Sequence, residues 1–195
     1  MKNDDRRAIA HELRNHALIL GGFIICIWVL EIVDLFVFRN ALNLYGIRPR
    51  NMIGLRGILF APFLHGGLGH LMANTVPFLV LGWLVMLREV SDFLIVSVIT
   101  ILTSGLGVWL FGSANSIHIG ASGLIFGYFG FLLSRGYFER SATGIAFSLF
   151  VGVLYGSLIW GVLPIRNGIS WEGHLFGFIG GILAARLLAR QKLSL

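Results

Sequence analysis

Six apolar segments, each about long enough to cross a lipid bilayer, are the feature that most limits how this chain can fold. A helix needs about 20 mainly apolar residues to cross the hydrocarbon core of a membrane. Charged residues make up only 12% of the chain, about half their share in an average soluble domain. We therefore expect an all-α fold, a polytopic membrane protein built as a bundle of six transmembrane helices. The predicted spans are residues 17–38, 67–88, 92–111, 117–135, 143–163 and 172–190.

The segments between these spans leave no room for a second domain, so we expect a single membrane domain over residues 1–195. The stretch 1–16 is charged throughout and lacks the pattern of a cleaved signal peptide, which predicts a short cytoplasmic N-terminal segment. The first loop, 39–66, is too apolar for a solvated linker and is interrupted by Pro49 and Pro62. We expect this loop to be partly embedded in the membrane interface.

The basic residues predict the orientation of the chain, because cytoplasmic loops of membrane proteins carry an excess of lysine and arginine. The net charge is +6, but the basic residues flank apolar segments and form no patch interleaved with aromatics, so we expect no nucleic-acid partner. The count favours cytoplasmic N and C termini, and the compact chain without a transit-like leader favours a bacterial inner membrane. The inner side then carries Lys2, Arg6, Arg7, Arg14, Arg88, Arg135, Arg140, Arg186, Arg190 and Lys192, and the outer side Arg39, Arg48, Arg50, Arg56 and Arg166.

Two acidic residues lie near the outer end of the first span. Polar groups within a membrane are costly and are functional candidates by default. We nevertheless expect Glu31 and Asp34 to reach the lipid headgroups, with Asp34 close enough to pair with Arg39. The histidines of the N-terminal segment, His11 and His16, are expected to be solvated.

Four other polar residues stand near the starts of the second, fourth and sixth spans. His70 and Asn74 are four residues apart, and therefore on one face of a helix. Ser122 lies just inside the fourth span, and His174 lies near the start of the sixth. These three helices cross the membrane in the same direction. We therefore predict that the four side chains gather at the extracytoplasmic end.

Glycine spacing predicts that the fourth and sixth helices pack closely. Small residues repeated every three or four positions let membrane helices approach until their backbones nearly touch. Such packing would bring Ser122 within hydrogen-bond reach of His174. A helix-packing surface alone explains the glycines equally well, but not a histidine at the matching depth. The two stripes are Gly123, Gly127 and Gly130, and Gly173, Gly177 and Gly181.

This set of residues suits acyl transfer by a serine–histidine dyad. A serine hydroxyl becomes a good nucleophile when a base accepts its proton, and His174 can later return that proton to the leaving amine. No acidic residue is placed to orient the histidine. The Asn74 amide, the His70 imidazole and the backbone N–H of Ser122 are available to stabilise an oxyanion. The glycines that would let a substrate backbone approach closely are Gly120 and Gly123.

The chain resembles the rhomboid family of intramembrane serine proteases. GASG at 120–123 matches the family's GxSG, HLMAN at 70–74 matches its HxxxN, and GHLFGFIGG at 173–181 matches its catalytic-histidine helix. The resemblance covers about residues 17 to 190. It implies six helices, no cofactor and no metal, and transmembrane protein substrates that are cleaved in the lipid bilayer near its outer face.

The resemblance also implies residue roles: Ser122 as the nucleophile, His174 as the base, and His70 and Asn74 as oxyanion or supporting residues. His65 falls where the family often has a histidine. The chain departs from the common pattern in two places. It has Leu55-Arg56 where many members have a Trp-Arg pair, and Phe126 where many have a tyrosine that stacks on the catalytic histidine. A phenyl ring can still stack, but it has no hydroxyl to donate.

The sequence also allows three alternative functions. A catalytically inactive rhomboid-like protein would bind membrane clients, although such proteins typically lose the serine or the histidine. A haem or metal protein could use His65, His70, His118 and His174, although the chain has no CxxCH motif. A small transporter should show inverted repeats or helices broken at mid-membrane. The sequence does not specify an oligomeric state.

Overall fold

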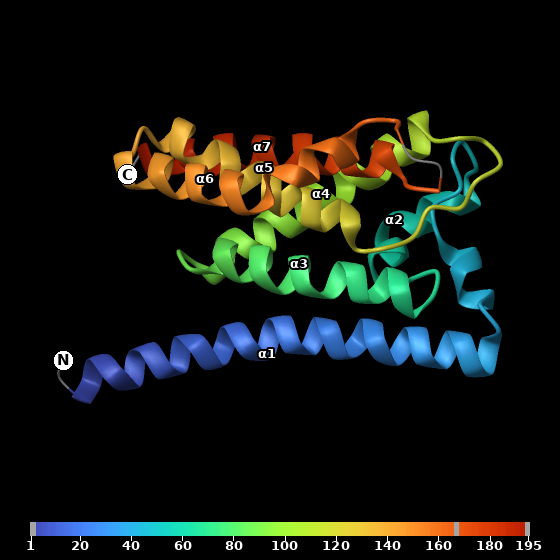
Figure 1. Ribbon diagram of the computed structural model, residues 1–195, viewed down its shortest axis with the longest axis horizontal. Helices are drawn as coiled ribbons and strands as arrows, with labels where there is room; N and C mark the ends of the chain where they lie inside the picture. Colours follow the sequence, from blue (N-terminus) through green and yellow to red (C-terminus); the bar gives the residue numbers. More distant parts are fainter. Residues whose placement is uncertain (1–2, 166–167, 194–195) are drawn as a thin grey trace.

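The computed structural model describes residues 3–165 and 168–193, and within these ranges every regular element is a helix. The predicted all-α bundle is thereby confirmed (Figure 1). Short 3₁₀ and π segments connect the longer helices at the end of the molecule opposite the termini. The α-helices are α1 (Asn3–Val33), α2 (Gly57–Phe60), α3 (Leu68–Met86), α4 (Val90–Phe111), α5 (Ser122–Glu139), α6 (Ala142–Tyr155) and α7 (Trp171–Leu193). The shorter segments are η1 (Asp34–Phe38), η2 (Ala41–Tyr45), η3 (Ile53–Arg56), η4 (Ala61–Phe63) and η5 (Gly156–Val162).

Five segments of the described residues are long and apolar enough to cross a membrane: Asp5–Phe38, Leu68–Met86, Val90–Phe111, Ala142–Val162 and Trp171–Arg190. The remaining predicted span is α5, which has 18 residues and carries Arg135 and Glu139 near its end. It begins at Ser122 and not at the predicted residue 117. The residues before it run as an extended segment, in which His118 pairs with Ile47 of the first loop.

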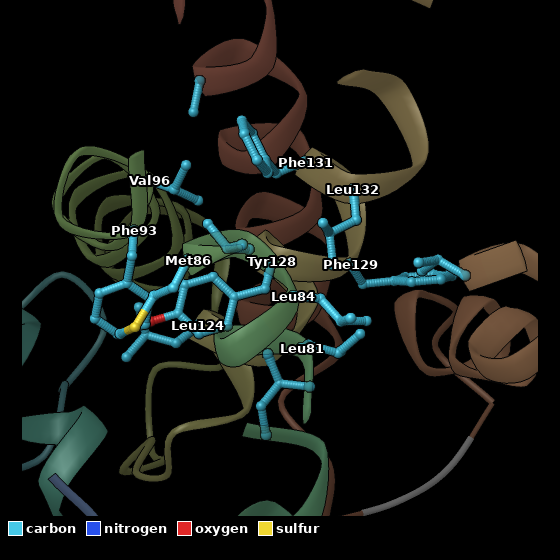
Figure 2. Close-up of a cluster of buried hydrophobic side chains, with 14 of the residues drawn as sticks. Leu81, Leu84, Met86, Phe93, Val96, Leu124, Tyr128, Phe129, Phe131 and Leu132 are labelled. Atoms are coloured by element: carbon cyan, nitrogen blue, oxygen red, sulfur yellow. The ribbon is translucent and has the colours of Figure 1, made fainter. Parts of the chain in front are cut away.

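α5 occupies the centre of the bundle and packs against α3, α4, α6 and α7. A cluster of buried apolar side chains from α3, α4 and α5 surrounds it (Figure 2). The hydroxyl of Tyr128, a fully buried member of this cluster, lies 2.8 Å from Ser97 Oγ on α4. A buried hydroxyl without a partner would be costly, so this hydrogen bond lets a tyrosine occupy the core.

Glycines bring α7 onto α5, as their spacing predicts. A Cβ atom on Gly177 would collide with the carbonyl oxygen of Gly123, and one on Gly181 would collide with that of Gly127. The backbones of the two helices are therefore in direct contact at the level of Ser122 and one turn below it. The other neighbours of the two stripes are Ser104 beside Gly123, Thr100 beside Gly127, the Phe178 carbonyl beside Gly130, and Ser170 beside Gly173.

α1 runs along one side of the bundle and contacts mainly α3 (Figure 1). The indole N–H of Trp28 donates to Thr75 Oγ1 at 3.1 Å. The segment predicted as 1–16 is helical from Asn3 and continuous with the span. The prediction that His16 is solvated is wrong, since this side chain is buried. Both ends of the chain lie at one end of the bundle in Figure 1. Two basic residues of the orientation count, Lys2 and Arg166, lie outside the described residues.

The headgroup placement predicted for the two acidic residues of the first span is also wrong. Glu31 and Asp34 are both 2% exposed. A Glu31 oxygen accepts a hydrogen bond from the backbone N–H of Gly67 at 2.7 Å. Asp34 accepts one from the backbone N–H of Leu42 at 2.9 Å, and does not pair with Arg39. Each carboxylate thus satisfies a backbone donor of an adjoining loop inside the protein.

The first loop, 39–66, folds into η2, η3, α2 and η4 and exposes several large apolar side chains. The loop is hydrogen-bonded to α4, because the Arg50 backbone N–H donates to the Trp109 carbonyl at 2.9 Å. Arg56 is exposed and lies over the Tyr45 ring, 4.4 Å from its centroid. The exposed apolar side chains of the loop include Leu44, Tyr45, Met52, Ile53, Leu59 and Phe60.

Candidate active site

The candidate site joins the first turn of α5 to the first turn of α7. Ser122 is the first residue of α5, and His174 is the fourth of α7. The hydroxyl oxygen of Ser122 lies 2.9 Å from Nε2 of His174. The glycine contact between the two helices, described above, sets this distance. Because a hydroxyl and an imidazole nitrogen at this separation form a hydrogen bond, the serine and the histidine are linked directly.

A backbone carbonyl orients His174. Its Nδ1 lies 2.9 Å from the carbonyl oxygen of Gly161, in η5. A carbonyl oxygen only accepts hydrogen bonds, so Nδ1 carries the hydrogen and the lone pair of Nε2 faces Ser122. The ring of Phe126 stacks on the imidazole, with centroids 4.0 Å apart and planes 8° from parallel. A Cβ atom on Gly161 would lie 2.5 Å from the Phe126 ring, so this close approach requires glycine.

His70 lies beside the loop that leads into Ser122. A Cβ atom on Gly120 would be 2.8 Å from Cε1 and Nε2 of His70. Gly120 also has a φ of +114°, a conformation that glycine adopts readily and other residues do not. The backbone N–H of Gly66 donates to Nδ1 of His70 at 3.3 Å. Because Nδ1 accepts this bond, the hydrogen of the neutral ring is on Nε2, one of the two ring atoms closest to Gly120.

Asn74 is buried one turn along α3 from His70. Its amide nitrogen donates to the His70 carbonyl at 2.8 Å. An amide nitrogen carries two hydrogens, so one N–H remains for another acceptor. The backbone N–H groups in the first turn of α5 are also available, since the first N–H groups of a helix have no partner within it.

Ser122, His174, His70 and Asn74 line one cleft of about 900 Å³. A second, small cavity of about 40 Å³ adjoins Ser122 and is lined by Gly123, Ala61 and Ser104 among others. The cleft is therefore large enough for a peptide segment. The small cavity has room for a small side chain only.

The loop before α5 is held by His118. Its Nδ1 lies 2.6 Å from the hydroxyl of Ser170, and its Nε2 lies 2.7 Å from that of Ser116. Burial lowers the pKa of His118 below its usual value, and the nearby Glu172 carboxylate opposes this shift. The imidazole is thus neutral near pH 7 and connects the Ser122 loop to the residue preceding α7. In the part of the chain that the structure describes, no three histidine, cysteine or acidic side chains are grouped as metal ligands would be.

Residues 54–191, more than half of the chain, match the family model described as Rhomboid domain. The chain belongs to the rhomboid family. An uncharacterized protein of Mycobacterium tuberculosis is 42% identical over 187 residues, which cover 89% of this chain and 78% of that protein. One of Mycobacterium leprae is 41% identical over 178 residues, covering 87% and 70%. The Bacillus subtilis protein named "Putative rhomboid protease YdcA" is 32% identical over 132 residues, covering 66% and 65%.

Family membership supports intramembrane protease activity in general. It also implies membrane protein substrates and a lipid environment. Together with its apolar helices, this makes the chain an integral membrane protein, and the mycobacterial relatives agree with a bacterial membrane.

Proposed function

We propose that this protein is an intramembrane serine endopeptidase in which Ser122 and His174 form the catalytic dyad. The observation that carries the proposal is the 2.9 Å contact between Ser122 Oγ and His174 Nε2. The Gly161 carbonyl holds the histidine in the tautomer that can accept the serine proton. An inactive client-binding protein, the alternative, would have no need of a base in this form.

The proposed reaction runs through an acyl-enzyme. Ser122 Oγ attacks the scissile carbonyl carbon while its proton passes to Nε2 of His174. The imidazolium then gives this proton to the leaving nitrogen, and the C–N bond breaks. A water molecule then loses a proton to the same nitrogen and attacks the ester carbonyl carbon. The imidazolium returns this proton to Ser122 Oγ as the acyl C–O bond breaks, and the carboxyl product leaves. The Gly161 carbonyl accepts from Nδ1 throughout and so favours the imidazolium.

The oxyanion of the tetrahedral intermediate needs hydrogen-bond donors. His70, Asn74 and Ser122 line the same cleft, and each has an N–H to offer: Nε2–H of His70, the second amide N–H of Asn74 and the backbone N–H of Ser122. The N-terminal end of α5 also favours a negative charge through its aligned peptide dipoles. These groups are the proposed oxyanion donors.

We place the cleavage site near the extracytoplasmic face, with both termini in the cytoplasm. The proposal rests on the distribution of basic residues, ten inside against five outside. Single cysteines in the loop 111–116 of a Cys26→Ser protein should react with an impermeant thiol reagent in intact cells. Cysteines in the loop 137–141 should react only after lysis. The reverse labelling pattern would show that the site faces the cytoplasm.

The substrate helix must unwind locally, because each carbonyl in a helix is bonded to the N–H four residues on. Unpaired backbone groups in lipid cost several kcal/mol each, so glycine and proline near the site should lower the barrier. The cavity of about 40 Å³ beside Ser122 supports Ala, Gly or Ser before the scissile bond. Replacing helix-breaking residues of a cleaved reporter with leucine should slow its cleavage. An unchanged rate would remove the unwinding step from the proposal.

A fluorophosphonate probe tests the proposal directly, since it reacts only with an activated serine. The purified protein should be labelled on Ser122, as located by peptide mass spectrometry, and Ser122→Ala should not be labelled. Ser104→Ala is the matched control, because Ser104 is a nearby serine whose hydroxyl donates to the Gly173 carbonyl. Labelling that persists in the Ser122→Ala protein would refute the assigned nucleophile.

A further inference from the structure

Glu31 is a buried ionisable residue near the end of α1 that no motif accounts for. It lies on α1, and its side chain is 2% exposed. A buried carboxylate is costly unless hydrogen bonds compensate it. The Gly67 backbone N–H donates to it at 2.7 Å, and the His65 backbone N–H also interacts with it. The carboxylate therefore holds the turn that precedes α3.

The same turn holds His70. Gly66 donates its N–H to Nδ1 of His70, and the His65 ring lies edge-on to the His70 ring with centroids 5.2 Å apart. Gly67 has a φ of +113°, and a Cβ there would meet nothing within 4 Å. The turn thus has an unusual backbone conformation without tight packing at Gly67, and the hydrogen bond to Glu31 ties the Gly67 N–H to α1.

The orientation of the turn decides what His70 can do. Only while the Gly66 N–H points at Nδ1 is the His70 hydrogen held on Nε2, the atom that faces Gly120. If the turn rotated, Nδ1 would lose its donor, and the ring could take the other tautomer. The proposed oxyanion donor would then present a lone pair toward a negative charge.

We propose that Glu31 is a positioning residue: through the Gly67 turn it keeps His70 as a hydrogen-bond donor directed at the Ser122 loop. This inference rests on the proposed function, because it gives Glu31 a role only through the oxyanion role of His70. A plain structural anchor for α1 would stabilise the fold without acting on His70.

Asp34 provides a matched control. It lies on the segment that continues α1, is equally buried, and also accepts a loop N–H, that of Leu42. The Leu42 N–H belongs to the first loop and not to the turn before α3. Asp34→Leu therefore removes a comparable buried anchor that does not hold the His70 turn.

The first experiment measures reporter cleavage in proteoliposomes. Glu31→Leu should lower kcat about tenfold or more with KM little changed, since misplacing a catalytic group by 1 Å can cost on the order of 10². Glu31→Gln should stay within about threefold of wild type, because its amide oxygen still accepts the Gly67 N–H. Asp34→Leu should lose as much thermal stability as Glu31→Leu, yet keep kcat. Equal kcat losses in the two leucine variants would overturn the inference.

A double-mutant cycle then separates the two roles. Glu31→Leu should have no further effect in a His70→Ala background. If it lowers kcat there by the same factor as in wild type, Glu31 does not act through His70. If His70→Ala alone cleaves like wild type, the oxyanion role itself fails and this inference fails with it. That result leaves the Ser122 assignment standing, because fluorophosphonate labelling tests the nucleophile separately.

Histidine-selective ¹⁵N labelling gives a readout independent of rate. In detergent-solubilised wild type, the His70 nitrogen shifts should correspond to a hydrogen on Nε2. Glu31→Leu should shift this population toward a mixture of tautomers, and Asp34→Leu should leave it unchanged. An unaltered His70 spectrum in folded Glu31→Leu protein would overturn the inference.

Discussion

His70 and His174 line the same cleft, but the backbone holds them in opposite forms. Nδ1 of His174 faces the carbonyl of Gly161, and Nδ1 of His70 faces the N–H of Gly66. One imidazole therefore presents a lone pair at Nε2 and the other a hydrogen. A sequence motif identifies each histidine, but a backbone group far away in the sequence sets whether Nε2 of that histidine can accept a proton or donate a hydrogen bond.

The largest expected effect comes from removing the proposed base, His174, or the proposed nucleophile, Ser122. Ser122→Ala and His174→Ala should each abolish cleavage of a transmembrane reporter, because without them neither nucleophile nor proton acceptor remains. Expression and helical circular dichroism should match wild type. Robust cleavage by either variant would end the assignment of the dyad.

Removing a proposed oxyanion donor should reduce the cleavage rate less than removing Ser122 or His174. His70→Ala and Asn74→Ala should lower kcat by on the order of 10²–10³, the usual effect of losing one oxyanion donor. Ser122 should remain reactive toward fluorophosphonate in both proteins. If both single variants and the double variant cleave like wild type, these residues are structural, and the contrast between the two histidines has no catalytic meaning.

Gly120 tests the contact between His70 and the serine loop. Gly120→Ala should lower kcat about tenfold more than Gly168→Ala. Both positions have positive φ, +114° and +81°, so both substitutions carry backbone strain of about 1–2 kcal/mol. Only the Cβ at Gly120 would meet His70, since at Gly168 nothing lies within 4 Å. Equal losses in a steady-state cleavage assay would show that backbone strain alone explains the effect.

The smallest effect concerns the turn that holds His70. Burial and the neighbouring His70 lower the pKa of His65 to about 4. In the unfolded chain the pKa of His65 is about 6.5. Between about pH 6.5 and 4 the unfolded chain therefore binds a proton at His65 that the folded chain does not, so the free energy of unfolding should decrease as the pH falls through this range.

The expected slope is at most about 1.4 kcal/mol per pH unit. Unfolding in detergent at several pH values, compared with that of His65→Gln, measures it. The substitution should flatten the pH dependence between 6.5 and 4 and leave it unchanged above pH 7. If the free energy of unfolding depended on pH in the same way in the two proteins, His65 would be hydrated in the folded state and its pKa would not be lowered by burial.

The all-α architecture and the segments that form the bundle are predictable from local patterns in the sequence. Hydropathy and helical periodicity are local properties, and lipid permits few alternatives to helices for an apolar chain. The spacing of Gly177 and Gly181 likewise predicted the close α5–α7 contact, because the absence of a side chain is visible in the sequence. The common direction of α3, α5 and α7 explains why Ser122 and His174 meet.

Contacts between segments far apart in the chain account for the features that these local rules do not predict. Residues 117–121 are apolar enough to be read as part of a span, yet they form a loop, because His118 pairs with Ile47 and Gly120 takes a left-handed conformation. Glu31 was expected at the headgroups and is buried, because a backbone donor from a distant turn compensates it.

The partners of the two histidines also came only from the tertiary structure. The carbonyl of Gly161 and the N–H of Gly66 are backbone groups. Almost every residue has both groups, so the sequence does not show which of them will contact a histidine. A motif records side chains, whereas the proton on each imidazole is set by whichever backbone group the fold brings to its other nitrogen.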